Sequence, residues 1–154
     1  MKYITRLYSE VLNEVRQAKT EEEKLQLLIE NKSEVLIDIF KYGFGNLDSP
    51  YRNGVPQYTP DDSPYGYSYS TLQKEFHRLS YFFNTKFLIS NEKLRDQKLK
   101  NILEMLHFSE AALLENIFTK KLDNYVSKEL VIKAYPELEK ELVWVKNKIV
   151  ILIH

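Results

Sequence analysis

The three histidines are the side chains best suited to acid–base chemistry near neutral pH. They are His77, His107 and His154. On an expected helix, His77 lies close to Glu75 and could act as a general base, although a histidine at the surface is the preferred interpretation. At a helix end, His107 is interpreted as a C-terminal cap. No two histidines are four residues apart and the sequence has no cysteine, so we expect no zinc site.

Other catalytic patterns are also weak. Adjacent Asp61 and Asp62 could form a pair of acids, but Pro60 and Pro64 flank them and favour a turn. All four glycines fall within residues 43–66, so the chain has no glycine-rich phosphate loop elsewhere. We therefore expect a protein that is not an enzyme and that binds neither a cofactor nor a metal.

The glycine-rich segment is also rich in tyrosine, with six tyrosines between residues 42 and 69. Such a ring supplies a large rigid contact area with a polar tip, which suits a protein interface. Five tyrosines are the candidates for partner binding: Tyr51, Tyr58, Tyr65, Tyr67 and Tyr69. The alternative is that the rings clamp the loop over the core. The loop carries one basic and three acidic residues, which favours a protein partner over a phosphate backbone.

Helices are expected on both sides of this loop, because apolar residues recur there at spacings of three and four. The candidate N-caps are Thr20, Asn31 or Ser33, Ser70 or Thr71, Asn91, Ser109 and Ser127. One apolar face after the loop consists of Leu72, Phe76, Leu79, Phe83 and Phe87. The helix that follows Ser127 should stop near Tyr135, since Pro136 follows. The expected class is all-α, a single bundle of about seven short helices.

The last residues are ambiguous. An apolar spacing suits a helix, whereas residues 148–154 alone are equally typical of a strand. The run at residues 149–153 could pair two copies into a homodimer, or could pack back on the core. No apolar stretch is long enough to cross a membrane, and we expect a soluble cytoplasmic protein.

Two segments together resemble a known domain. The first comprises Val11-Leu12-Asn13-Glu14-Val15, then Thr20, Lys24, Leu27-Leu28 and Asn31-Lys32. The second comprises Leu113-Leu114, Ile117, Lys120-Lys121-Leu122-Asp123, Ser127, Lys133 and Tyr135-Pro136. They resemble the N-terminal α-helical DNA-binding domain of T4-type ATP-dependent DNA ligases. The chain is also similar to a set of small proteins of T4-like bacteriophages.

The length and the helical pattern predict one domain over residues 1–154. Within it the resemblance covers about residues 11–136, apart from the loop at 43–70, and leaves out a C-terminal extension at 137–154. It implies binding of duplex DNA on the minor-groove side. Catalysis is not implied, because the ligase motif Lys-x-Asp-Gly is missing. Where the ligase turn has small residues, this chain has Asn124-Tyr125-Val126, whose bulk hinders close approach of the backbone to phosphate.

Charge is distributed unevenly along the chain. Lys and Arg total 22 and Asp and Glu total 22, so the net charge is zero. Residues 72–101, however, carry seven basic and three acidic groups, net +4, and a smaller surplus lies within residues 117–135. The candidates for DNA contact are Lys98, Lys100, Lys120, Lys121, Tyr125, Lys128 and Lys133. Gathered on one face they would favour DNA, whereas dispersed lysines would favour a protein partner.

The sequence therefore supports two leading hypotheses. In the first, the protein is a non-catalytic phage accessory protein that binds duplex DNA through a ligase-type helical domain. In the alternative, it is an interaction module for a phage replication or transcription protein, or for a host defence protein. A small hydrolase or nuclease that uses His77 or His107 with nearby acids is the third and weakest hypothesis.

Overall fold

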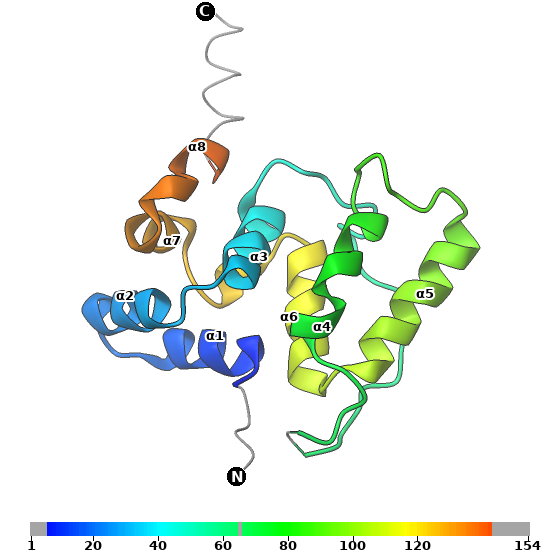
Figure 1. Cartoon of the computed structure of the whole chain (residues 1–154), viewed down its shortest axis with the longest axis horizontal. Coiled ribbons are helices and arrows are strands. Elements are labelled where there is room, and N and C mark those ends of the chain that lie inside the picture. Colours follow the sequence, from blue (N-terminus) through cyan, green and yellow to red (C-terminus); the bar gives the residue numbers. More distant parts are fainter. Residues whose placement is uncertain (1–5, 65, 143–154) are drawn as a thin grey trace, which may run out of the picture.

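The computed structural model describes residues 6–64 and 66–142 of the chain, and helices dominate this part (Figure 1). The α-helices are α1 (Tyr8–Gln17), α2 (Glu21–Glu30), α3 (Glu34–Phe44), α4 (Leu72–Glu75), α5 (Glu92–Met105), α6 (Phe108–Phe118), α7 (Lys128–Ala134) and α8 (Glu139–Leu142). The 3₁₀ helices are η1 (Phe76–Phe82), η2 (Leu122–Asn124) and η3 (Pro136–Leu138). No strand occurs within the described residues, and the predicted all-α class is confirmed.

Side-chain caps set most of the helix starts. A side-chain oxygen at each of four N-caps accepts the backbone N–H three residues on, at 3.1 to 3.2 Å. These N-caps are Thr20, Ser33, Asn91 and Ser127. The same role falls to Thr71 at the start of α4. Each satisfies a backbone donor that has no partner inside its helix, so these predicted boundaries are confirmed.

Three local predictions were wrong, and one of them is the N-cap at Ser109, a residue that lies inside α6. The helix after the loop does not continue to Phe87, because Thr85 interrupts it: its hydroxyl donates to the carbonyl of Ser80 and accepts the N–H of Phe87. The chain turns there and leaves Phe87 55% exposed instead of on the apolar face. His107 is not a C-terminal cap but the N-cap of α6, since its Nδ1 accepts the N–H of Ser109 at 3.1 Å.

Helix α6 lies at the centre of the fold and packs against α1, α3 and α5 (Figure 1). Its inward side chains are fully buried: Ala111, Leu113, Leu114, Ile117 and Phe118. On one side of α6, helix α2 packs against α1 and α7. On the other side lie η1 and α5, which contact each other. This arrangement separates the α2–α7 end from the η1–α5 end, and the predicted DNA contacts are divided between these two ends.

The segment between α3 and α4 is a long loop without helices, which runs beside α5 in Figure 1. The backbone of Asp61 pairs with the start of α6, where it accepts the N–H of Phe108 at 3.1 Å. Asp61 Oδ1 accepts the N–H of Ser63 at 3.0 Å, so the interpretation of Asp61 as a turn residue is confirmed. In the part of the chain that the structure describes, no helix is long and apolar enough to span a membrane.

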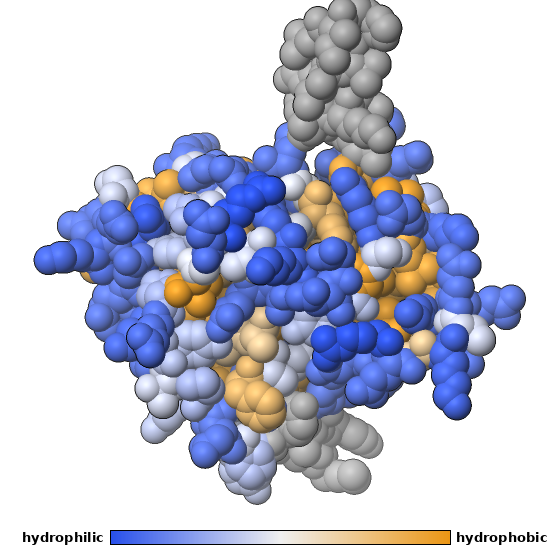
Figure 2. All heavy atoms as spheres, turned by 180° about the vertical axis from the view of Figure 1, so that it is seen from behind, coloured by the Kyte–Doolittle hydropathy of each residue, from blue (hydrophilic) through white to orange (hydrophobic). Residues whose placement is uncertain are grey.

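The reverse face of the molecule is mainly hydrophilic (Figure 2). Its apolar side chains show as separate patches, of which the largest lies toward the α2–α7 side. Residues 149–153, the predicted homodimer contact, lie outside the described residues. The segment at 148–154, for which a helix and a strand are both predicted, lies outside them as well.

Candidate interaction surface

Lys120 points into the fold instead of toward solvent. Its ammonium group donates to the carbonyls of Tyr42, at 2.5 Å, and Gly45, at 3.4 Å, at the C-terminal end of α3. It also lies 5.6 Å from the centre of the Phe83 ring. Burial lowers the pKa of this lysine to about 8. Its hydrogen-bonding capacity is therefore used to close α3, and it is not placed to contact phosphate.

The remaining candidates of the second ligase-like segment lie in α7 or in the residues just before it, and α7 packs against a helix that begins with acidic residues. Lys133 forms an ion pair with Glu21, at 3.0 Å. Tyr125 is buried, and the guanidinium of Arg16 stacks 4.7 Å from its ring centre. Lys121 is exposed and Lys128 half-buried. Three consecutive glutamates, residues 21–23, form the first turn of α2, which packs against α7. This end of the molecule thus presents mixed charge.

The other two candidates are on α5, at the opposite end of the fold. Lys98 and Lys100 are two residues apart, so their side chains project about 200° apart around the helix axis. Lys98 is exposed and lines a groove against η1, whereas Lys100 is half-buried. The predicted DNA contacts are therefore dispersed, because Lys120 is turned into the fold and the others are divided between the α7 side and α5.

Two of the predicted partner-binding tyrosines anchor the loop to the core. The hydroxyl of Tyr51 donates to Asp96 at 2.6 Å and accepts from Arg95 at 3.0 Å. Its ring packs edge-on against Phe118, with centroids 5.6 Å apart. Burial raises the pKa of Tyr51 to about 12. Tyr58 donates to Glu115 on α6, and burial raises its pKa as well. Tyr51 and Tyr58 therefore hold the loop against the core, as in the alternative interpretation of the tyrosine-rich loop.

Replacing Tyr51 with phenylalanine should lower the free energy of unfolding by about 1 kcal/mol, because the ring stays while two hydrogen bonds to charged groups are lost. The matched control is Tyr67→Phe, whose hydroxyl is in solvent and whose effect should stay within about 0.5 kcal/mol. Urea denaturation of both variants measures the difference. Equal effects would mean that the Tyr51 hydroxyl does not hold the loop.

The other described tyrosines of this set remain uncovered. Tyr67 is 78% exposed and Tyr69 is 91% exposed. We call these two residues the aromatic tip. The next residue, Ser70, donates its N–H to the carbonyl of Met105 at 3.0 Å, which ties the tip to the end of α5. Tyr65 lies outside the described residues.

A groove between η1 and α5 was missed by sequence reasoning. It has a volume of about 450 Å³ and is lined by Arg78, Tyr81, Phe82, Ile89, Lys98, Asn101, Ile102 and Met105. We call it the η1–α5 groove. Its lining includes two cations and no carboxylate, and Tyr81 is 43% exposed at its edge. The carbonyl of Met105, a residue of the groove lining, accepts the N–H of Ser70, so the segment that follows the aromatic tip is attached at one end of the groove. The sequence feature that could have indicated this groove is the net charge of +4 over residues 72–101.

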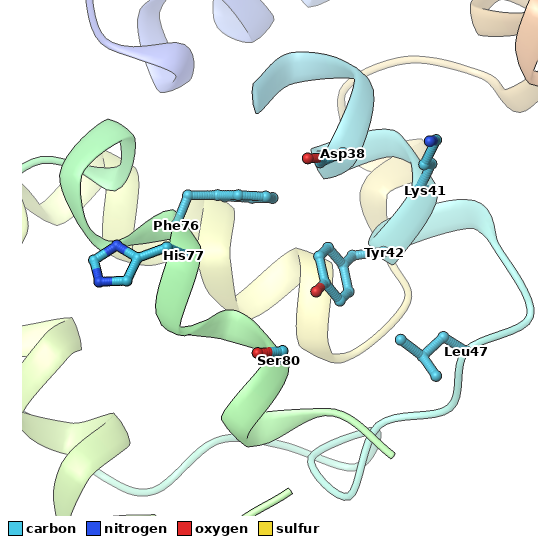
Figure 3. A pocket seen from close by; sticks show the side chains of 7 residues that line it. All are labelled: Asp38, Lys41, Tyr42, Leu47, Phe76, His77 and Ser80. Atoms are coloured by element: carbon cyan, nitrogen blue, oxygen red, sulfur yellow. The ribbon is translucent and has the colours of Figure 1, made fainter. Parts of the chain in front are cut away.

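A second hollow, between α3 and η1, contains groups that could perform chemistry (Figure 3). Figure 3 shows the ring of Phe76 pointing toward Tyr42, whereas the imidazole of His77 points away from Asp38. The Nδ1 of His77 pairs with the carbonyl of Lys74 at 2.9 Å instead of with an acid or with Ser80. Burial raises the pKa of Asp38. These groups do not form a linked nucleophile, base and acid.

Metal-binding groups are also dispersed. No cluster of three or more histidine, aspartate or glutamate side chains suited to a metal ion occurs within residues 6–64 and 66–142.

Comparison with known proteins gives one match. A model of the Family of unknown function (DUF6433) matches residues 11–124. Neither the curated proteins nor the solved structures contain a match to the chain.

Proposed function

The chain belongs to the DUF6433 family, and from its own surface we propose that it is a non-catalytic interaction module that binds a protein partner. The aromatic tip and the η1–α5 groove form the proposed binding surface. The sequence resemblance to phage proteins suggests a phage replication or transcription protein, or a host defence protein, as the partner.

The exposure of Tyr67 and Tyr69 is the observation that carries this proposal. Rigid aromatic side chains are frequent anchors of protein interfaces, and a few such residues supply most of the binding energy. The aromatic tip is linked through Ser70 to Met105, which lines a groove with apolar side chains. A site for a phosphate backbone would instead need several cations on one face.

The test compares two matched double variants of the full chain. We expect Tyr67→Ser/Tyr69→Ser to weaken binding to the partner by about tenfold to 100-fold, because hot-spot rings contribute roughly 1–3 kcal/mol. We expect Lys121→Ser/Lys128→Ser to leave the affinity unchanged. The partner is first captured from infected cells and then purified, and calorimetric titration supplies the dissociation constants. Full affinity of the tyrosine variant would refute the proposed surface.

Duplex DNA is the second candidate partner, favoured by the ligase-like segments and by the exposure of Lys121 and Lys133. Glu21–Glu23 on the adjoining helix weaken the case, since carboxylates repel phosphate. The prediction from this candidate is that intact or nicked duplex binds at low salt and that Lys121→Ser/Lys128→Ser reduces the salt slope by about 2. Fluorescence anisotropy from 20 to ~200 mM salt measures this slope. A flat salt dependence would contradict DNA binding through these lysines.

A further inference from the structure

We propose that the η1–α5 groove binds an acidic amphipathic helix of the partner protein. This inference rests on the proposed function, which it extends by naming what enters the groove. The groove has two charged walls, an apolar floor and a definite length, and each of these features restricts the occupant.

The charge of the groove favours an acidic occupant. Arg78 on η1 and Lys98 on α5 face the groove from its two sides, and both are exposed. The guanidinium of Arg78 lies 3.4 Å from the carboxylate of Glu75, which neutralises part of its positive charge. No carboxylate, however, lines the groove itself. Carboxylates on both flanks of a bound segment would therefore meet a cation on each side, which sets its orientation.

The floor of the groove favours hydrocarbon or aromatic side chains. Phe82 and Ile102 close the bottom, and Ile89 with Met105 lie higher on the walls, partly exposed. Methionine adapts its shape to different apolar partners, which suits a recognition groove. The rim adds Tyr81, whose ring can cover an inserted side chain. Filling this floor removes apolar surface from water, which is the main source of affinity for such a segment.

The length of the groove matches a helical segment. Its α5 wall runs from Lys98 to Met105, which at 1.5 Å per residue is about 10 Å, roughly two turns of a helix. A helix bound in a groove presents anchors at positions i, i+4 and i+7 over this distance. A nucleic-acid strand is the competing occupant, because a base could stack on Tyr81 between two cations. The aliphatic side chains of Ile89, Ile102 and Met105 in the lining favour the peptide.

The test uses a display library of helical peptides, randomised at three anchor positions (i, i+4, i+7) and at the positions that flank them. It is selected against the full chain. We expect enriched peptides to carry Leu, Phe or Trp at the anchors and Asp or Glu at the flanks. We expect Arg78→Glu/Lys98→Glu to weaken them at least tenfold. The control Lys121→Glu/Lys128→Glu makes the same charge change at the α7 end and should have no effect.

Several results would overturn the inference. One is enrichment of peptides with no acidic preference. A second is equal binding to the Arg78→Glu/Lys98→Glu variant, once circular dichroism has shown that it folds. A third is displacement of the peptides by single-stranded DNA at equal concentration, which would make the groove a nucleic-acid site. If the natural partner depends on Tyr67 and Tyr69 but not on Arg78 and Lys98, the interaction function stands and the groove assignment fails. If binding of the partner depends neither on the two tyrosines nor on the two cations, both the proposed interaction surface and the groove assignment fail.

Discussion

Replacing Phe118 with alanine should lower the free energy of unfolding by about 3–5 kcal/mol, the range expected for loss of a buried aromatic ring. Phe118 is fully buried and ends the central helix α6. Its ring stacks on Phe83 with centroids 4.8 Å apart, and it meets the edges of Tyr51 at 5.6 Å and Phe82 at 6.4 Å. One ring therefore joins α6, η1 and the long loop.

The size of the loss in free energy of unfolding shows whether the Phe118 ring supports α6, η1 and the loop together or only its own helix. Phe118→Leu keeps most of the volume and should cost only about 1.5 kcal/mol. Chemical denaturation supplies both values. Because Phe118 supports Tyr51 and Phe82, we also expect the alanine variant to expose the loop to limited proteolysis. A loss below 1 kcal/mol without faster cleavage would mean that the loop and η1 do not depend on this ring.

Replacing Glu110 with glutamine should remove a large pH dependence of stability. This carboxyl group is 1% exposed, and its Oε1 accepts the N–H of Leu72 at 2.9 Å. Burial raises its pKa from 4.5 to about 7, which outweighs the lowering by the N–H groups of Leu72 and Tyr8. The nearby charge of Glu10 raises it further, while Arg6 and Lys74 line the same cavity. The folded protein therefore favours the protonated acid.

The sign follows from linkage. With a folded pKa above the unfolded value, the contribution of Glu110 is fully present below pH 4.5 and is lost as the pH rises through about 7. The shift corresponds to a loss of about 3 kcal/mol by pH 8. Burial lowers the pKa of His107, so its contribution runs in the opposite direction. The contribution of His107 is the same in wild type and in Glu110→Gln, so the difference in stability between the two proteins reports the Glu110 carboxyl group alone.

The measurement is urea unfolding of wild type and Glu110→Gln at pH values from 5 to 8. We expect the variant to gain stability relative to wild type as the pH rises from 5 to about 7, and the difference to level off by pH 8. Glu104→Gln is a suitable control, because Glu104 is half-buried and bonds the N–H of Thr59 in an exposed position. A difference between wild type and Glu110→Gln that does not change with pH would show that Glu110 is ionised in the folded protein.

Local signals predicted the helices well and the surface poorly. Capping is a relation between residues three apart, so Thr20, Ser33, Asn91 and Ser127 could be identified from the sequence alone. The failure at Phe87 has a local cause too, since the helix ends at Phe82 and the hydroxyl of Thr85 bonds the backbone of Ser80 and Phe87 in the turn that follows.

The role of each lysine depends on contacts between distant segments. Lys120 meets carbonyls 75 and 78 residues earlier in the chain, and Lys133 meets Glu21 across 112 residues. A count of charge by region could not reveal such partners. The same holds for the η1–α5 groove, whose two walls are brought together by tertiary packing, although the spacing of Lys98, Ile102 and Met105 on one face of α5 was visible.

The buried acid Glu110 illustrates a further limit. In the sequence it follows Ser109 in what is typical of a first helical turn, where acidic residues are common and usually exposed. The structure turns this side chain toward Leu72, 38 residues away. Its burial follows from the way α1, α4 and α6 meet, and no pattern along the chain encodes that meeting.

The most direct test of the proposed interaction surface is an amide chemical-shift map of ¹⁵N-labelled protein titrated with its purified natural partner. The account predicts that the perturbed amides cluster at residues 66–70, at residues 78–82 and along α5 from Lys98 to Met105, with little change around α7. Perturbations centred on Lys121, Lys128 and Lys133, with the aromatic tip unaffected, would contradict it.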